Sequence, residues 1–347
     1  MIGTCPNNKT TRCKAIFFSS LVLLASLYPG VQSYGASLEE LMSTGQQSLS
    51  AGNYAQAISD FQSAKELVTP ESSDYDKVCF YLSKSYLLSG DSEKAETEFS
   101  SLTTLHPETP ASDDLYYLFG KWYQDHGDYS QASTCLTRLV NQYTESTYRA
   151  KGYLYLMWVG FRTANTKLLN DSLAKVKQDY PGSPDEATAL CQMARYDILK
   201  KKYDSAYSTY QSVLAHYPDY RWGRAECFKG LGEIKLHQGK YTEANAYFDQ
   251  IKGMDINQTW NLLSDEMRVY SDTLAKHYPE AVTRLEQMLS ETTDPNKKAQ
   301  YLCTLGDVHL KAKQQVEAKQ RFEEARTQYP STSWGKLADK TLKGISQ

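Results

Sequence analysis

Apolar residues recur along the chain in a pattern that repeats every 37 or 38 residues. Each repeat centres on an anchor position, alanine in seven of eight cases, with apolar residues four and seven positions later. These spacings bring the three side chains to one face of a helix. The anchors are Ala57, Ala95, Ala132, Leu169, Ala206, Ala244, Ala281 and Ala318. The pattern therefore predicts eight amphipathic helices of one kind.

Another helix is predicted before each anchor helix, because turn sequences such as residues 52–54 (Gly-Asn-Tyr) and 127–129 (Gly-Asp-Tyr) precede the anchors. Glycine inside a helix costs about 1 kcal/mol relative to alanine, so a glycine that recurs there indicates a close approach of two helices. Met157 and Val269 stand at this position in the fourth and seventh repeats. Twelve residues before the anchor, the other six repeats carry a small residue: Gly45, Ser83, Gly120, Ala194, Gly232 and Gly306.

Each repeat is thus expected to be a helical hairpin that cannot bury its apolar stripes alone, so its stability must come from stacking on its neighbours. Proline follows four anchors by twelve residues and ends the helix there: Pro107, Pro181, Pro218 and Pro330. We expect an all-α solenoid of about eight hairpins over residues 38–330. A C-terminal capping helix should follow within residues 331–347, from about Trp334 to Ile345, with three lysines facing solvent.

The combination of small residue, alanine anchor, aromatic or leucine residue and closing proline resembles the tetratricopeptide repeat family over about residues 38–330. The usual unit of that family has about 34 residues, so these longer units predict a first helix extended at its start. The long units and Tyr-Pro closures are similar to exported envelope members of the family, which assist outer-membrane β-barrel assembly or coordinate with the Tol complex. The resemblance implies a non-enzymatic scaffold or adaptor that acts by binding other proteins.

The N-terminal segment has the layout of an export signal. Three basic residues precede an apolar run at residues 15–27, and residues 31–33 (Val-Gln-Ser) offer a cleavage site before Tyr34. We expect residues 1–33 to be removed and the chain to be periplasmic or secreted, with a bacterial envelope favoured. An uncleaved anchor is the alternative, but the run has 13 residues and a membrane span needs roughly 20. No cysteine stands directly after the run, at residues 28–36, which departs from the lipoprotein pattern.

Composition and charge argue against nucleic acid as a partner. The formal net charge of −3 becomes −6 when the signal segment is removed, leaving 35 basic against 41 acidic residues. Phosphate binding needs concentrated positive charge, which this balance does not provide. No stable membrane insertion is expected after cleavage, and the pattern predicts no particular oligomeric state.

The mature chain keeps five cysteines, which are widely spaced and form no Cys-x-x-Cys pair. Neither a zinc site nor a full disulfide framework is indicated, and most of these residues should be small core hydrophobes. One disulfide between neighbouring repeats stays open in an oxidising compartment. The cysteines are Cys79, Cys135, Cys191, Cys227 and Cys303.

The family resemblance implies that the first helices line a concave groove. Its middle would be basic and aromatic on an otherwise acidic protein, which suits an acidic or amphipathic partner segment. In the competing interpretation, Tyr117 and Trp158 pack between repeats and the lysines are solvated. The second functional hypothesis is a carrier or receptor for a glycan or peptide in the same groove. The residues assigned to the groove are Lys77, Phe80, Lys84, Tyr117, Lys121, Lys151, Trp158, Arg162, Arg195, Lys229, Glu233 and Tyr270.

Motifs for catalysis are missing from the sequence. No two of the six histidines are three to five residues apart, and no Gly-rich phosphate loop or Gly-x-Ser-x-Gly turn occurs. We therefore expect no catalytic residues, no metal and no cofactor.

Overall fold

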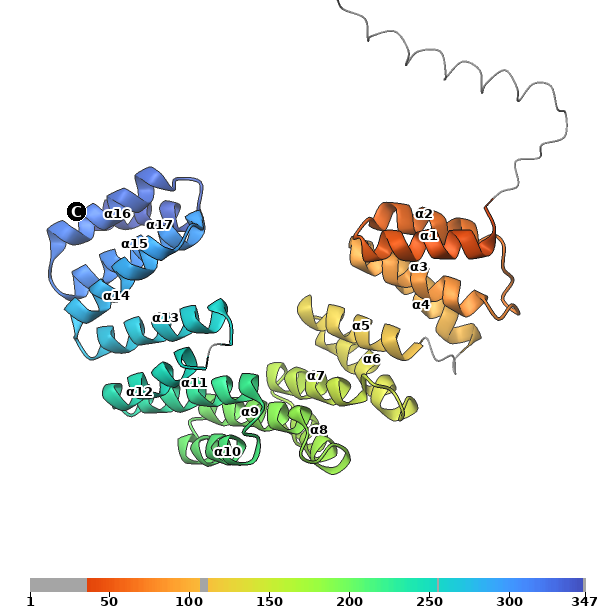
Figure 1. Cartoon of the computed structure of the whole chain (residues 1–347), viewed down its shortest axis with the longest axis horizontal. Helices are drawn as coiled ribbons and strands as arrows, with labels where there is room; N and C mark the ends of the chain where they lie inside the picture. The colour runs from red at the N-terminus through yellow and green to blue at the C-terminus, as the bar shows by residue number, and fades with distance from the viewer. Residues whose placement is uncertain (1–35, 107–111, 255, 346–347) are drawn as a thin grey trace, which may run out of the picture. The chain divides into compact units, whose positions relative to one another are not determined.

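The computed structural model describes residues 36–106, 112–254 and 256–345 (Figure 1). All regular secondary structure in these ranges is α-helical, in seventeen helices, which confirms the predicted all-α class. The expected signal segment, residues 1–33, lies outside the described residues, as does Pro107. Within the described ranges, no helix combines the length and the apolar character that a membrane span requires.

Sixteen helices form the eight expected hairpins, and α17 (Ser333–Ile345) follows the last of them. Helices that follow one another in the sequence pack side by side (Figure 1), which is the arrangement of a tetratricopeptide-like solenoid. The hairpins are α1 (Leu38–Ser50) with α2 (Tyr54–Lys65), α3 (Tyr75–Ser89) with α4 (Ser92–Leu105), α5 (Ser112–Asp125) with α6 (Tyr129–Gln142), α7 (Arg149–Arg162) with α8 (Thr166–Asp179), α9 (Pro184–Leu199) with α10 (Tyr203–His216), α11 (Arg221–His237) with α12 (Tyr241–Lys252), α13 (Gln258–Leu274) with α14 (Tyr278–Glu291), and α15 (Pro295–Lys311) with α16 (Gln315–Gln328).

The chain divides into two compact units between Leu115 and Tyr116, within α5. The first unit holds α1 to α4 and the start of α5, and the second holds the remaining helices. The sequence period carries no sign of this division, because the anchors Ala95 and Ala132 on either side are 37 residues apart like most others.

The two helices of each hairpin pack through the anchor positions and the small positions. All eight anchors are at most 1% exposed, as the pattern predicted. Four residues after its anchor, Phe248 places its ring against Gly232 of the same hairpin, where a Cβ atom would lie 2.2 Å from the ring. Gly45, Gly120 and Gly306 stand in the same relation to Phe61, Leu136 and Phe322, with the corresponding distance 2.6 Å in each case. The predicted close approach is therefore confirmed, and its cause is a large side chain seated on the glycine.

The fourth and seventh hairpins carry a larger residue at the small position. Met157 and Val269 are buried at the small position, and the facing position, four residues after the anchor, carries Leu173 or Leu285 where most other hairpins have an aromatic ring. The two irregular repeats are thus still packed hairpins.

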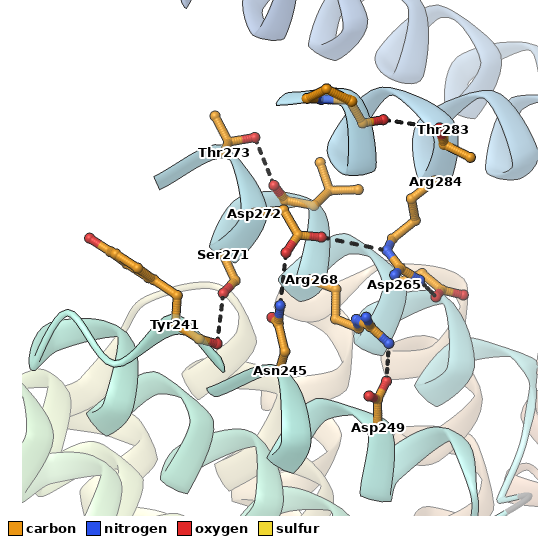
Figure 2. Close-up of polar contacts among 12 residues, drawn as sticks. Tyr241, Asn245, Asp249, Asp265, Arg268, Ser271, Asp272, Thr273, Thr283 and Arg284 are labelled. Atoms are coloured by element: carbon orange, nitrogen blue, oxygen red, sulfur yellow. Dashed lines mark hydrogen bonds and ion pairs between the residues drawn. The ribbon is translucent and has the colours of Figure 1, made fainter. Parts of the chain in front are cut away.

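A polar network adds to the packing between α12, α13 and α14 (Figure 2). Asp272, only 4% exposed, accepts a hydrogen bond of 2.8 Å from Asn245 and lies 4.0 Å from the Arg284 Nε atom. Arg284 also donates to Asp265 at 3.1 Å, and Arg268 pairs with Asp249. These contacts join the sixth hairpin to the seventh, where Val269 replaces the usual small residue.

The last helix, α17, covers the end of the second unit. Its Ala338 and Leu342 are buried against a cluster that includes Leu302 of α15 and Phe322 of α16. The opposite face is polar, and its lysines, Lys336, Lys340 and Lys343, are exposed. The predicted capping helix is therefore present and begins one residue earlier than expected.

Candidate functional site

Three of the residues assigned to the groove lie on α3 in the first unit. The Lys84 ammonium group is 3.1 Å from an Asp114 carboxylate oxygen and 5.2 Å from the centre of the Phe80 ring. Lys77 is exposed and lies 3.7 Å from Asp74. Because Lys84 already has a carboxylate partner, the positive charge of this surface is partly neutralised.

Tyr117 lies on the part of α5 that belongs to the second unit. It packs between the third and fourth hairpins of the chain. Its ring stacks on Tyr148 at a centroid distance of 4.7 Å and meets the Tyr155 ring edge-on at 5.7 Å. Burial raises the pKa of Tyr155, as expected for a phenol that has lost water. Lys151 lies over Tyr148 at 5.8 Å, and Lys121 pairs with Asp125 at 2.8 Å. Tyr117 thus makes the inter-repeat contact of the competing interpretation.

A concave site forms where α7, α9 and α11 meet. Trp158 of α7 stacks on Phe161 at 5.1 Å with an interplanar angle of 11°. The Arg195 guanidinium of α9 lies 5.6 Å from the centre of the Trp158 ring, a distance at which a cation is attracted to an indole face. These residues border a pocket of about 250 Å³. Its lining is completed by Met157, Leu169, Thr188, Cys191, Gln192, Tyr220, Trp222, Gly223 and Glu226.

The polar groups of this pocket are only partly satisfied. Thr188 and Tyr220 share a hydrogen bond of 3.0 Å between their hydroxyl groups. The side-chain oxygen of Gln192 is buried and accepts no hydrogen bond. A buried carbonyl without a donor carries a desolvation cost of about 1–3 kcal/mol, which a donor on a ligand would remove. The pocket therefore combines aromatic walls, one cation and one acceptor without a donor.

Glu226 lines the pocket and belongs to a row of charged residues along α11. The Lys229 ammonium lies 3.5 Å from Glu226 and 3.8 Å from Glu233. Burial raises the pKa of Glu233, while Lys229 and Arg195 oppose that rise. Opposite charges therefore alternate along this part of α11.

Two of the assigned residues make contacts elsewhere. Arg162, at the end of α7, donates from Nε to the Tyr129 hydroxyl at 2.9 Å, and its guanidinium lies 5.7 Å from the Tyr129 ring centre. Tyr270 is 54% exposed and borders a separate pocket of about 230 Å³ between α13 and α15. Of the twelve assigned residues, the pocket between α7, α9 and α11 brings together Trp158 and Arg195.

Sequence reasoning missed four residues that shape this pocket. Glu226 precedes its anchor by 18 residues, as the assigned residues Lys77 and Lys151 do, so the same spacing finds it. Phe161 lies one turn after Trp158 on the same helix. Gln192 and Trp222 fall outside those offsets. Trp222 is available because α11 has 17 residues against 14 in α7, an extension that the longer repeat period predicted without placing any side chain.

The described residues contain no group of three or more His, Cys, Asp or Glu side chains placed to hold a metal ion. The expected lack of catalytic residues and cofactors stays a prediction.

Comparisons with known proteins agree with the architecture. Residues 35–125 match a family described as outer membrane lipoprotein, and residues 114–146 match a tetratricopeptide repeat model. A tetratricopeptide repeat protein from Parabacteroides merdae ATCC 43184 is similar in structure with a TM-score of 0.54 and 13% identity, over 90% of this chain and 100% of that one. The apo form of RapI gives a TM-score of 0.56 and 10% identity, over 89% of this chain and 97% of that one.

Likeness at such low identities concerns the fold alone. The comparison with curated proteins gives no match. The helical hairpins with buried anchors and the repeat model that matches residues 114–146 point to the same kind of repeat. In its fold and repeat pattern the chain resembles tetratricopeptide repeat proteins, and its residues 35–125 resemble an outer membrane lipoprotein family.

Proposed function

We propose that this chain is a non-enzymatic scaffold of the cell envelope that binds a segment of a partner protein in the pocket between α7, α9 and α11. The observation that carries the proposal is the convergence of Trp158, Phe161 and Arg195 beside the unpaired Gln192 oxygen. Tryptophan and arginine are the side chains most often found to dominate binding energy at protein interfaces.

The chemistry of the pocket defines the segment that it fits. An apolar or aromatic side chain would enter between the aromatic walls. Arg195 favours a carboxylate on the segment, and Glu226 on the opposite wall disfavours a second one nearby. An amphipathic segment with one acidic residue beside its apolar anchor meets these requirements.

The envelope location rests on two supports. The match over residues 35–125 is to an outer membrane lipoprotein family, and the sequence predicts an export signal at residues 1–33. Cleavage before Tyr34 would release a chain whose intact mass and N-terminal peptide identify the site directly. A chain recovered from cells with Met1 retained would contradict export by cleavage.

Replacing Trp158 and Arg195 together by alanine should abolish partner capture, because it removes the indole wall and the cation at once. The measurement is affinity purification of the full chain with quantitative mass spectrometry of co-purifying proteins. We expect at least a tenfold loss, corresponding to about 1.4 kcal/mol, while the melting temperature changes by a few degrees at most.

The matched control is the double replacement of Tyr129 and Arg162 by alanine. That pair has the same ring-and-guanidinium geometry, at 5.7 Å compared with 5.6 Å, and lies outside the pocket. Equal capture by the pocket variant and the unaltered chain would refute the proposal, as would equal losses in both variants. Retention of glycan without a stoichiometric protein would favour the carrier function instead.

A further inference from the structure

Two cysteines meet beneath the proposed binding pocket. Cys191 of α9 and Cys227 of α11 are 36 positions apart in sequence, and their sulfur atoms are 3.5 Å apart. Both side chains are buried, with 4% and 0% exposure. Cys191 also lines the pocket and lies 3.8 Å from the Gly223 carbonyl oxygen. These two thiols have no role in the proposed binding.

The geometry points to a disulfide between Cys191 and Cys227 when the chain folds in an oxidising compartment, stapling the two helices that form adjacent walls of the pocket. The bond requires the sulfur atoms to approach from 3.5 Å to about 2.05 Å. The helices α9 and α11 are already in direct contact, so the bond needs a small side-chain adjustment and no new docking.

The reaction is a thiol–disulfide exchange with a thiol–disulfide oxidoreductase or glutathione disulfide as the oxidant. The thiolate of one cysteine attacks the oxidant's disulfide, forms a mixed disulfide and releases one thiol. The second cysteine's thiolate then attacks the chain's sulfur in that mixed disulfide and releases the other thiol. In sum, the two cysteines lose two electrons and two protons, and the oxidant's disulfide becomes two thiols.

The timing follows from burial. The hydrogen bond to Cys227 and burial both raise the pKa of Cys191, so a folded, reduced chain holds little of the thiolate that the exchange needs. Oxidation should therefore be fast while α9 and α11 are still closing and slow afterwards. The remaining cysteines, Cys79, Cys135 and Cys303, lie on α3, α6 and α15 and serve as internal references.

The test uses the full chain, reduced and unfolded, then refolded in a mixture of reduced and oxidised glutathione. After alkylation of free thiols under denaturing conditions, non-reducing peptide mapping should give one linked peptide containing Cys191 and Cys227, with every other cysteine alkylated. Closing a loop of this length should raise the melting temperature by about 5–10 °C over the reduced chain. The shift should be absent in Cys191→Ser and Cys227→Ala.

A second experiment does not require refolding. The folded, reduced chain is treated with glutathione disulfide, and the same peptide map should show the Cys191–Cys227 bond forming more slowly. Alkylation of every cysteine in both experiments would overturn the inference, as would pairing of Cys191 or Cys227 with any other cysteine or an intermolecular bond. Refolding in glutathione does not depend on export or on a binding partner, so its outcome is separate from that of the proposed function.

Discussion

The turn that joins the two helices of each hairpin contains one residue with left-handed backbone geometry, five positions before the anchor. Four hairpins place glycine there, including Gly127 with φ of 83° and Gly239 with φ of 71°. The other four have side chains at the same position: Ala164, Lys201, Lys276 and Lys313, with φ between 57° and 63°. An L-residue in this region costs roughly 1–2 kcal/mol, so four hairpins carry a strain that the others avoid.

Replacing Lys276 by glycine should therefore stabilise the protein, by up to about 1 kcal/mol after the greater freedom of glycine in the unfolded chain is counted. Gly127→Ala should destabilise it by about 1 kcal/mol. Urea unfolding followed by circular dichroism measures both. Opposite signs are expected, and equal signs would show that the turn geometry does not govern the effect.

Glu233 gives the protein a defined pH response. Burial raises its pKa above the ordinary value of 4.5, so the folded chain holds this proton more tightly than the unfolded chain does. Stability from this group is present below pH 4.5 and is lost as the pH rises through the raised pKa.

Glu233→Gln should consequently increase the free energy of unfolding at pH 7 and give a smaller increase at pH 4. Glu243 is the control, because its hydrogen bond to Lys235 lowers its pKa and its contribution is lost as the pH falls. Unfolding curves for Glu233→Gln and Glu243→Gln between pH 4 and pH 7 give the change in the free energy of unfolding. Its dependence on pH should have opposite signs in the two variants. A pH-independent effect of Glu233→Gln would contradict the assignment.

At the scale of the helix pair, the facing residues act as a unit. Phe248 sits on Gly232 so closely that a Cβ atom on the glycine would lie 2.2 Å from the ring. The fourth hairpin carries the buried Met157 at the same position. Glycine at this position thus makes room for the large side chain four residues after the anchor.

Gly232→Ala should cost about 1–3 kcal/mol through overpacking, even though alanine is the better helix former. Adding Phe248→Leu should recover part of that loss, and a double-mutant cycle measures the coupling. Gly344→Ala is the control, since no atom lies within 4 Å of a Cβ there. Additive effects of the two substitutions would contradict the facing-pair account.

At the scale of the whole molecule, the sequence period predicted the eight hairpins and the capping helix, because stacking demands the same buried positions in every repeat. The family resemblance, and not the period, assigned Trp158 and Arg195 of this pocket to the groove. It could not predict Gln192 or Trp222, since these depend on how far the starts of α9 and α11 extend and how those helices meet. The inter-repeat packing of Tyr117 against Tyr148 likewise depends on side-chain directions that a period does not contain.

Photo-cross-linking in living cells tests the central claim, that the face formed by α7, α9 and α11 is where a partner binds. A photoreactive aromatic residue replaces Trp222, which is 52% exposed at the pocket, and in a second strain replaces exposed Ser208 on α10. We predict cross-links from position 222 to one protein segment with an apolar anchor beside an acidic residue, and none from position 208. Cross-links from position 208 without any from position 222 would contradict the account.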